Sequence, residues 1–177
     1  EKMIKHLFFL RHFETNNNIN GNLNGQSLEE PICVGHYIEK RASFDTIYCS
    51  TALRCKQTVE WVEGQNNIIF TEQLLERNLG LLEGHPRTEM QKQYPELFER
   101  DRFNVFSTPP EGESYSEFYG RASQFWVVSN NSNDENVMIC SHNQMLKILY
   151  FVIFDKAVTI QAWEQLRFPH GEIIKIK

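Results

Sequence analysis

The sequence lacks the cysteine and histidine spacings that usually mark metal or redox sites. Its four cysteines, at positions 33, 49, 55 and 140, include no C-x-x-C pair, and its six histidines include no H-x-x-x-H pair. These absences argue against a thiol redox motif and against a zinc site. Because Cys49, Cys55 and Cys140 lie in apolar or element-forming stretches, we predict reduced, packed thiols, as is usual in the cytoplasm. We therefore expect no bound metal and no cofactor.

Excess positive charge and long apolar runs are also absent. The chain has 177 residues with 23 acidic against 18 basic side chains, a net charge of −5. This balance argues against a general nucleic-acid surface but leaves room for a local basic pocket. The apolar run at 148–154 is too short to cross a bilayer, and residues 3–10 end in Arg11 rather than in the small residues of a secretion signal. We expect a cytoplasmic protein with no nucleic-acid or membrane partner.

Apolar runs and helical patterns alternate along the chain. The predicted strands are residues 4–10, 44–49, 67–71 and 137–140. The predicted helices are residues 51–63, 87–94, 114–128 and 142–154. The third helix has a capping box at its start, Ser114-x-x-Glu117. This alternation predicts an α/β fold, a three-layer α/β/α sandwich whose mostly parallel central sheet carries helices on both faces.

Other segments have weaker patterns. Residues 27–42 are a helix candidate that Pro31 and Gly35 weaken. Two segments rich in asparagine, glycine and other polar residues are predicted loops, at 16–25 and 129–136. Two late segments are predicted strands that form a hairpin or an edge pair, at 159–168 and 172–176. Because no repeat or long linker divides the chain, we expect one domain over residues 1–177.

Charged residues follow the predicted strands. In a parallel sheet, ligands bind beyond the carboxyl ends of the strands. Arg11 and His12 follow the first strand, Ser141 and His142 follow the strand at 137–140, and Arg54 lies in the first turn of the helix after the second strand. We therefore expect two arginines and two histidines along the edge formed by the carboxyl ends of the strands, called the rim below. A helix N-terminus, which favours anions, is expected beside them.

Each of these residues has a plainer interpretation when taken alone. An Arg-His pair at a strand end is often a solvated terminus, a histidine after a strand is often a helix cap, and an arginine on a helix usually lies at the surface. Their convergence favours an anion site, because clustered cations without an acidic neighbour need a compensating anion. Arginine forks match phosphate oxygens, and histidine can act as a nucleophile near neutral pH.

Five motifs in order resemble those of the histidine phosphatase superfamily, the phosphoglycerate-mutase-like enzymes. The first is Arg11-His12-Phe13-Glu14-Thr15, with Asn18 three residues later, against the family pattern R-H-G-[ED]-[ST]. The others are S-x-x-x-R-x-x-x-T at 50–58, L-x-E-x-x-x-G-x-x-E-G at 74–84, P-x-G-E-S at 110–114, and S-H-N-Q at 141–144. Two positions depart from the family pattern, since Phe13 and Asn143 replace glycines. Either glycine could allow a backbone geometry or a close phosphate approach that a side chain hinders.

The resemblance implies a mechanism. His12 attacks the phosphorus of a monoester to form a phosphohistidine, while Arg11, Arg54 and His142 hold the equatorial oxygens. Glu76 protonates the leaving oxygen and then activates water, provided that its surroundings suit it to carry a proton. The residues expected to bind substrate are Asn18, Gln26 and Asn143. Glu83, Glu113 and Ser114 are expected to shape loops and caps rather than to react.

Three functions remain open at this point. The leading one is a metal-independent phosphatase for a small phosphorylated metabolite. The second is a mutase of the same superfamily, which returns the phosphoryl group to another hydroxyl; mutases tend to be longer, so 177 residues favours the phosphatase. The third is a weakly active member that binds a phosphorylated ligand or a protein, which only Phe13 and Asn143 support.

Substrate specificity is expected in the segments at 16–26 and 88–110, neither of which has a readable code. Three nearby arginines could bind a second anionic group, although their pattern equally fits a solvated surface; they are Arg87, Arg100 and Arg102.

Overall fold

A computed structural model describes residues 3–39, 42–64 and 67–177, and a five-stranded sheet lies at its centre with the order β3-β2-β6-β1-β7. Its strands are β1 (His6–Arg11), β2 (Thr46–Ser50), β3 (Ile68–Thr71), β6 (Asn136–Ser141) and β7 (Ile173–Lys175). The first four are mutually parallel, and β7 pairs antiparallel with β1 at the edge. The prediction of a mostly parallel sheet is therefore confirmed.

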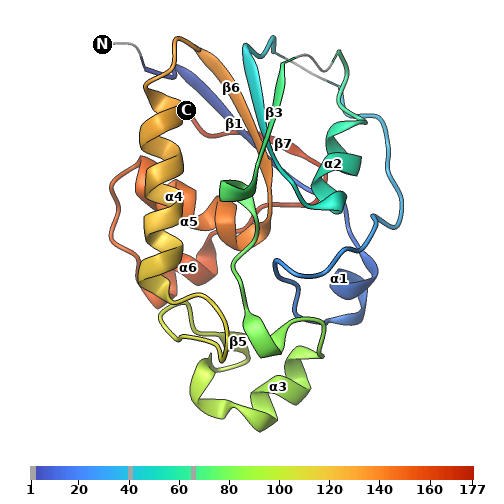
Figure 1. Ribbon diagram of the computed structural model, residues 1–177, viewed down its shortest axis with the longest axis vertical. Helices are drawn as coiled ribbons and strands as arrows, with labels where there is room; N and C mark the ends of the chain where they lie inside the picture. The colour runs from blue at the N-terminus through green and yellow to red at the C-terminus, as the bar shows by residue number, and fades with distance from the viewer. Residues whose placement is uncertain (1–2, 40–41, 65–66) are drawn as a thin grey trace.

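Helices cover both faces of this sheet (Figure 1). On one side lie α4 (Tyr115–Asn130), α5 (Asn143–Ile153) and α6 (Ile160–Gln165), and on the other lies α2 (Leu53–Val59). Successive side chains of a strand point to opposite faces, so Phe9 of β1 packs in the same cluster as α4 and α5, while Leu10 packs with α2. Burial on both faces explains why the strands are nearly continuous apolar runs.

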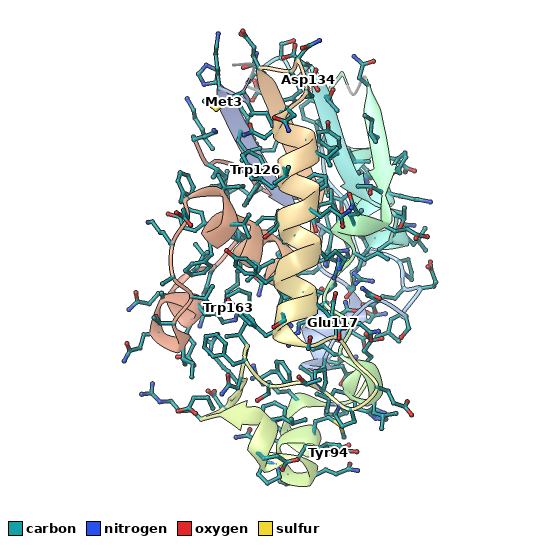
Figure 2. All side chains as sticks on the ribbon, turned by 60° about the vertical axis from the view of Figure 1, so that its left-hand side comes forward. Met3, Tyr94, Glu117, Trp126, Asp134 and Trp163 are labelled. Atoms are coloured by element: carbon teal, nitrogen blue, oxygen red, sulfur yellow. The ribbon has the colours of Figure 1, made fainter. Side chains whose placement is uncertain are left out.

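The longest helix, α4, starts where its capping signal predicts. The Ser114 hydroxyl accepts a hydrogen bond from the Glu117 backbone N–H at 3.1 Å. Its apolar stripe, including Phe118, Phe125 and Trp126, faces the sheet, whereas Val127 and Val128 are exposed. Figure 2 shows the helix along its length, with Glu117 and Trp126 labelled.

The helix predicted at 27–42 is wrong for residues 27–39 and 42; residues 40 and 41 lie outside the described part of the chain. The segment is irregular, with isolated bridges from Ile32 to Thr15 and from Ile38 to Val62. Pro31 cannot donate a helical hydrogen bond. The Trp61 indole also lies so close to Gly35 that any Cβ there would overlap it. Contacts with distant segments therefore decide this stretch.

Two further predictions need correction. Residues 159–168 form no strand but contain helix α6, because the Thr159 hydroxyl caps Ala162 N–H at 3.1 Å and Trp163 packs onto α5. The predicted hairpin is therefore absent, although β7 confirms the last strand as an edge strand. The predicted loop at 16–25 begins with a one-turn helix, α1 (Asn16–Asn20), which Thr15 caps and Gly21 ends with φ +73°.

A segment of short elements lies beyond the carboxyl ends of the parallel strands, where Figure 1 shows α3 and β5. This cap segment, residues 80–103, consists of η2 (Gly80–Leu82), α3 (Arg87–Gln93), η3 (Pro95–Leu97), β4 (Phe98–Glu99) and β5 (Arg102–Phe103). It has its own small apolar cluster that includes Leu82, Met90 and Leu97. The cap segment therefore lies over the carboxyl ends of the strands, and it overlaps the segment at 88–110 in which substrate specificity was expected.

Buried Arg77 holds the chain that follows the cap segment. Its guanidinium donates to the carbonyls of Val105 (2.7 Å), Ser107 (2.8 Å) and Glu113 (3.2 Å), and it packs on the ring of Phe103. Burial lowers its pKa to about 10, partly offset by the negative charge of Glu113, so it stays charged at neutral pH. Three carbonyls satisfied by one fixed fork hold the two ends of the loop after β5 in place.

Cys49, Cys55 and Cys140 are buried and unbridged, as predicted, and Cys33 is exposed. In the described ranges, no helix has the length and apolar character needed to span a membrane.

Candidate active site

Two histidines face each other at the carboxyl edge of the sheet. The parallel register of β1 and β6 pairs Arg11 with Ser141, so the residues that follow, His12 and His142, come out side by side. Their ring centroids are 5.2 Å apart, and the two residues are 3% and 1% exposed. The expected meeting of the two strand ends is therefore confirmed.

The tautomer of His12 follows from its backbone partner. His12 Nδ1 lies 2.6 Å from the carbonyl oxygen of Phe13, which can only accept a hydrogen bond. Nδ1 therefore carries the proton, and Nε2 keeps a free lone pair. The Phe13 N–H in turn donates to the Thr58 hydroxyl at 2.9 Å, and that hydroxyl donates to the Arg54 carbonyl at 2.7 Å. The last residue of the S-x-x-x-R-x-x-x-T motif thus holds the loop that orients His12.

Both histidines are held in the neutral form. Burial, followed by the positive charge of Arg54, holds the pKa of His12 well below its usual value of 6.5, although its bond to Phe13 acts in the opposite direction. Burial and Arg54 likewise hold the pKa of His142 well below 6.5. Burial lowers the pKa of Arg11 to about 10, which leaves Arg11 charged at neutral pH. The arginines therefore carry the positive charge of the rim. The expectation that these cations lack an acidic neighbour is wrong, because Glu76 lies near Arg11.

The two arginines each have a buried donor without a partner. Arg54 donates to the carbonyls of Gly25 (2.7 Å) and Leu28 (3.1 Å), and Arg11 donates to that of Phe168 (3.1 Å). The Nε–H groups of Arg11 and Arg54, however, have no hydrogen-bond partner among the described residues. Buried donors of this kind are rare in native proteins, and beside a neutral histidine they fit the oxygens of an anion.

Ser50, at the end of β2, positions the second histidine. Its hydroxyl lies 2.9 Å from His142 Nε2, and the Cys55 sulfur lies 3.5 Å from the same nitrogen. The first residue of the S-x-x-x-R-x-x-x-T motif therefore fixes the ring of His142.

Glu76 lies at the N-terminus of α5. Its Oε1 accepts the N–H groups of Arg77 (2.9 Å) and Met145 (3.1 Å), and its Oε2 accepts that of Gln144 (3.1 Å). The carboxylate thus satisfies free N–H groups of the helix start. Among the described bonds, only one lone pair of Oε2 is left for a proton or for water.

An ion pair holds the loop that carries Glu76. Arg121 of α4 makes a two-pronged contact with Glu113, at 2.9 Å for each oxygen. The same guanidinium donates to the carbonyls of Gln73 (2.9 Å), Leu75 (2.7 Å) and Glu76 (3.2 Å). Glu113 therefore shapes a loop, as expected. Glu83 does the same by accepting the N–H groups of Gln26 and Leu79.

The residues expected to bind substrate are placed as follows. Asn18 Oδ1 bonds the Thr15 N–H and hydroxyl, and no bond from its Nδ2 is found in the described residues. Gln26 is half-buried on the loop that Arg54 holds, and its backbone N–H binds Glu83. Asn143 is the half-buried first residue of α5, next to His142. Asn18 thus belongs to α1, Gln26 to a loop and Asn143 to the start of α5.

Sequence reasoning missed His170, whose ring centroid lies 5.5 Å from that of His12. His170 Nδ1 lies 2.9 Å from the His12 carbonyl and donates to it. Burial, with the charge of Arg11, lowers its pKa below 6.5. Because β7 runs antiparallel to β1, the short segment before β7, which contains His170, falls at the same edge as the residue after β1. The direction of β7 would have been the signal, and the sequence does not contain it.

The family profile described as "Histidine phosphatase superfamily (branch 1)" matches residues 7–177. The chain belongs to this superfamily. The broad-specificity phosphatase YOR283W of Saccharomyces cerevisiae is 26% identical over 184 residues, which cover 87% of this chain and 77% of that protein. The 2,3-bisphosphoglycerate-dependent phosphoglycerate mutase of Methanosarcina mazei is 31% identical over 110 residues, 60% of this chain and 45% of that protein. The solved structure of the alpha-ribazole phosphatase from Shigella flexneri has the same fold, with a TM-score of 0.76, 19% identity and coverage of 96% and 89% of the two chains.

Phe13, the residue that departs from the superfamily's first motif, is a core residue. It is 3% exposed, and its ring lies 4.7 Å from that of His36. A Cβ on Gly171, which has φ +66°, would overlap the Phe13 ring. Among described non-glycine residues, neither Phe13 nor Asn143 has a positive φ, so neither backbone is strained. In this member of the superfamily, Phe13 fills the space beside Gly171 and packs in the core.

The packing of Phe13 against Gly171 predicts energetic coupling. Gly171→Ala should destabilise the protein by about 2–4 kcal/mol, from its positive φ and the overlap with the ring. Phe13→Ala should cost about 3–5 kcal/mol because it leaves a cavity. In the double variant the overlap is relieved. Its loss in the free energy of unfolding, measured in urea, should therefore be smaller than the summed losses of the two single variants by about 1 kcal/mol or more. Gly120→Ala, at an open helical position, is the control and should add independently to Phe13→Ala. Strict additivity at Gly171 would contradict this packing.

The neutral histidines predict a pH dependence of stability. The pKa of His12 and that of His142 are lowered in the folded state, so near pH 6 the unfolded chain binds protons that the folded chain does not. Stability is thus fully present above about pH 6.5 and falls as the pH drops below it, by up to about 1.4 kcal/mol per pH unit for each histidine. His12→Asn should reduce this slope when unfolding is followed between about pH 7 and 5. The exposed His85→Asn is the control, and an equal change in both variants would refute the assignment.

Proposed function

We propose that this chain is a phosphatase that hydrolyses a small phosphomonoester through a phosphohistidine at His12. The observation that carries the proposal is a neutral, buried His12, with Nδ1 committed to Phe13 and its Nε2 lone pair free, beside two arginines with unpaired Nε–H donors. In the first step Nε2 attacks phosphorus and the ester oxygen departs. In the second step water attacks phosphorus, the N–P bond breaks with its electron pair returning to Nε2, and inorganic phosphate and neutral His12 are released.

Arg11, Arg54 and His142 are proposed to hold the phosphoryl oxygens. The two guanidiniums supply fixed positive charge, and neutral His142, held by Ser50, supplies a hydrogen bond. Because these groups match the charge of the transferring phosphoryl group, the proposed reaction requires no metal. Asn18, Gln26 and Asn143 adjoin the same rim and are proposed to contact the rest of the substrate.

Glu76 is proposed to move the proton. It lies close enough to Arg11 for its negative charge to raise the pKa of that guanidinium, against the effect of burial. Its Oε2 keeps a lone pair that can carry a proton. It would give this proton to the leaving oxygen and take one from the attacking water. The three N–H donors hold the carboxyl group in one orientation.

A mutase is the second candidate, and the similarity to the Methanosarcina mazei phosphoglycerate mutase supports it. The two reactions share the phosphohistidine and differ in what accepts the phosphoryl group, water or a second hydroxyl. Product analysis with phosphoglycerates separates them, since a mutase yields an isomeric phosphate and a phosphatase yields inorganic phosphate.

The phosphohistidine step has a direct test. Incubation with a labelled phosphomonoester, with EDTA present, should give an acid-labile, base-stable protein label that is absent in His12→Ala. Ser50→Ala should retain the label but slow its formation, since Ser50 only positions His142. A label that persists in His12→Ala would exclude His12 as the nucleophile, and a need for added metal would exclude the metal-free reaction.

The role of Glu76 predicts a dependence on the leaving group. Glu76→Gln should slow the first turnover of an alkyl phosphate by about 10²–10⁴-fold, because an alkoxide leaves only with a proton. It should slow the burst with p-nitrophenyl phosphate much less, because that phenolate leaves unaided. Glu14→Gln is the matched control, since Glu14 is an exposed carboxylate that also faces Arg11. Equal slowing of both bursts would make Glu76 a positioning residue.

A further inference from the structure

A cavity of about 180 Å³ opens beside the rim, between α5, α6 and the cap segment. Its wall includes Asn143 and Gln144 from the start of α5, Lys147 one turn later, Trp163 from α6, and Arg102 from β5. Trp163 is labelled in Figure 2, at a height between Trp126 at the level of the sheet and Tyr94 in the cap segment.

Lys147 is a buried cation. The residue is 4% exposed, and its Nζ lies 4.4 Å from the centre of the Trp163 ring. In the described ranges it forms no ion pair and no hydrogen bond through Nζ. Burial, helped by the charge of Arg102, lowers the pKa of Lys147 to about 8, although Glu76 and Glu164 act in the opposite direction. A charge kept at this depth is costly unless an anion joins it.

A second unpaired group lies on the same wall. Gln144 Oε1 is buried and has no hydrogen-bond partner among the described residues. The side-chain amide thus offers the cavity a polar group to which a ligand hydroxyl or amine could donate.

The charges around the cavity favour an anion. Arg87 and Arg102 line it together with Lys147, against Glu99 and Glu164. Of the three arginines that the sequence offered for a second anionic group, two therefore lie here, while Arg100 lines a different hollow at the surface. The apolar part of the wall, which includes Leu23, Phe103 and Val105, can cover a short carbon chain.

The cavity adjoins the proposed phosphoryl site through the start of α5. The backbone N–H of Gln144 binds Glu76 Oε2 at 3.1 Å, so one residue contacts both. Lys147 also lies within electrostatic range of Glu76 and Arg11. A substrate whose phosphoryl group meets His12 would have its other end close to Lys147.

We propose that this cavity is a second anion subsite, in which Lys147 and Arg102 bind a carboxylate or a second phosphate of the substrate and Gln144 accepts a hydrogen bond from a neighbouring hydroxyl. The inference rests on the proposed function, and it restricts the substrate class to small hydroxylated phosphomonoesters with a further anionic group. The side of the Lys147 ammonium group that Trp163 does not cover would bind the second anionic group and so select these substrates.

The test compares two pairs of substrates that differ by one anionic group. The carboxylate pair is 3-phosphoglycerate and glycerol 3-phosphate, and the phosphate pair is glucose 1,6-bisphosphate and glucose 6-phosphate. The wild type should prefer the doubly anionic member of at least one pair by tenfold or more in kcat/KM. Lys147→Met keeps the stem that packs on Trp163 and removes the charge, so it should fold, and it should reduce that preference by about 10–100-fold. The pair that responds identifies the second group as carboxylate or phosphate.

Arg100→Met is the matched control, since it removes a cation from the cap segment outside this cavity, and it should retain the wild-type preference. Equal loss on both members of each pair, or no preference in the wild type, would overturn the subsite. Calorimetric titration of the same four compounds separates this outcome from failure of the proposed function. A chain that hydrolyses none of them but binds a doubly anionic member more tightly, in a manner lost in Lys147→Met, would keep the subsite and refute the phosphatase.

Discussion

The parallel pairing of β1 with β6 is the constraint on which the rest of the site depends. Its register puts Arg11 opposite Ser141, so two histidines 130 positions apart leave the sheet at one edge with their rings 5.2 Å apart. Backbone hydrogen bonds set this register, and the alternation of core residues on both faces maintains it, because a slip by one residue would turn each apolar side chain to the wrong layer.

Burial at that edge divides the chemical roles. Desolvation keeps His12 and His142 neutral, which suits a nucleophile and a hydrogen-bond donor, whereas the guanidiniums remain charged at neutral pH even when buried. A buried lysine behaves differently, since burial brings the pKa of Lys147 down to about 8. The permanent positive charge beside His12 therefore comes from arginine. Lys147, whose charged form an anionic ligand would stabilise, lies in the neighbouring cavity.

Buried arginines also hold the loops that no regular element fixes. Arg77 satisfies three carbonyls around the cap segment, and Arg121 joins Glu113 to the loop that carries Glu76. Each fork engages several acceptors at once, so it orders a loop at the cost of one desolvated charge. These arginines hold Glu76 at the start of α5 and hold the cap segment over the carboxyl ends of the strands.

The sequence by itself determined the layered α/β fold, because nearly continuous apolar runs and capped helices are local signals. It also pointed to Arg11, His12, Arg54 and His142, since charged residues after buried strands share one edge. Only the tertiary structure decided that residues 159–168 form a helix, that 27–39 form none, and that His170 and Lys147 border the site. These depend on contacts between distant segments: the direction of β7, the indole of Trp61 against Gly35, and the ring of Trp163 against Lys147. Local propensity does not encode such contacts, and neither does it encode the desolvation that leaves the histidines neutral.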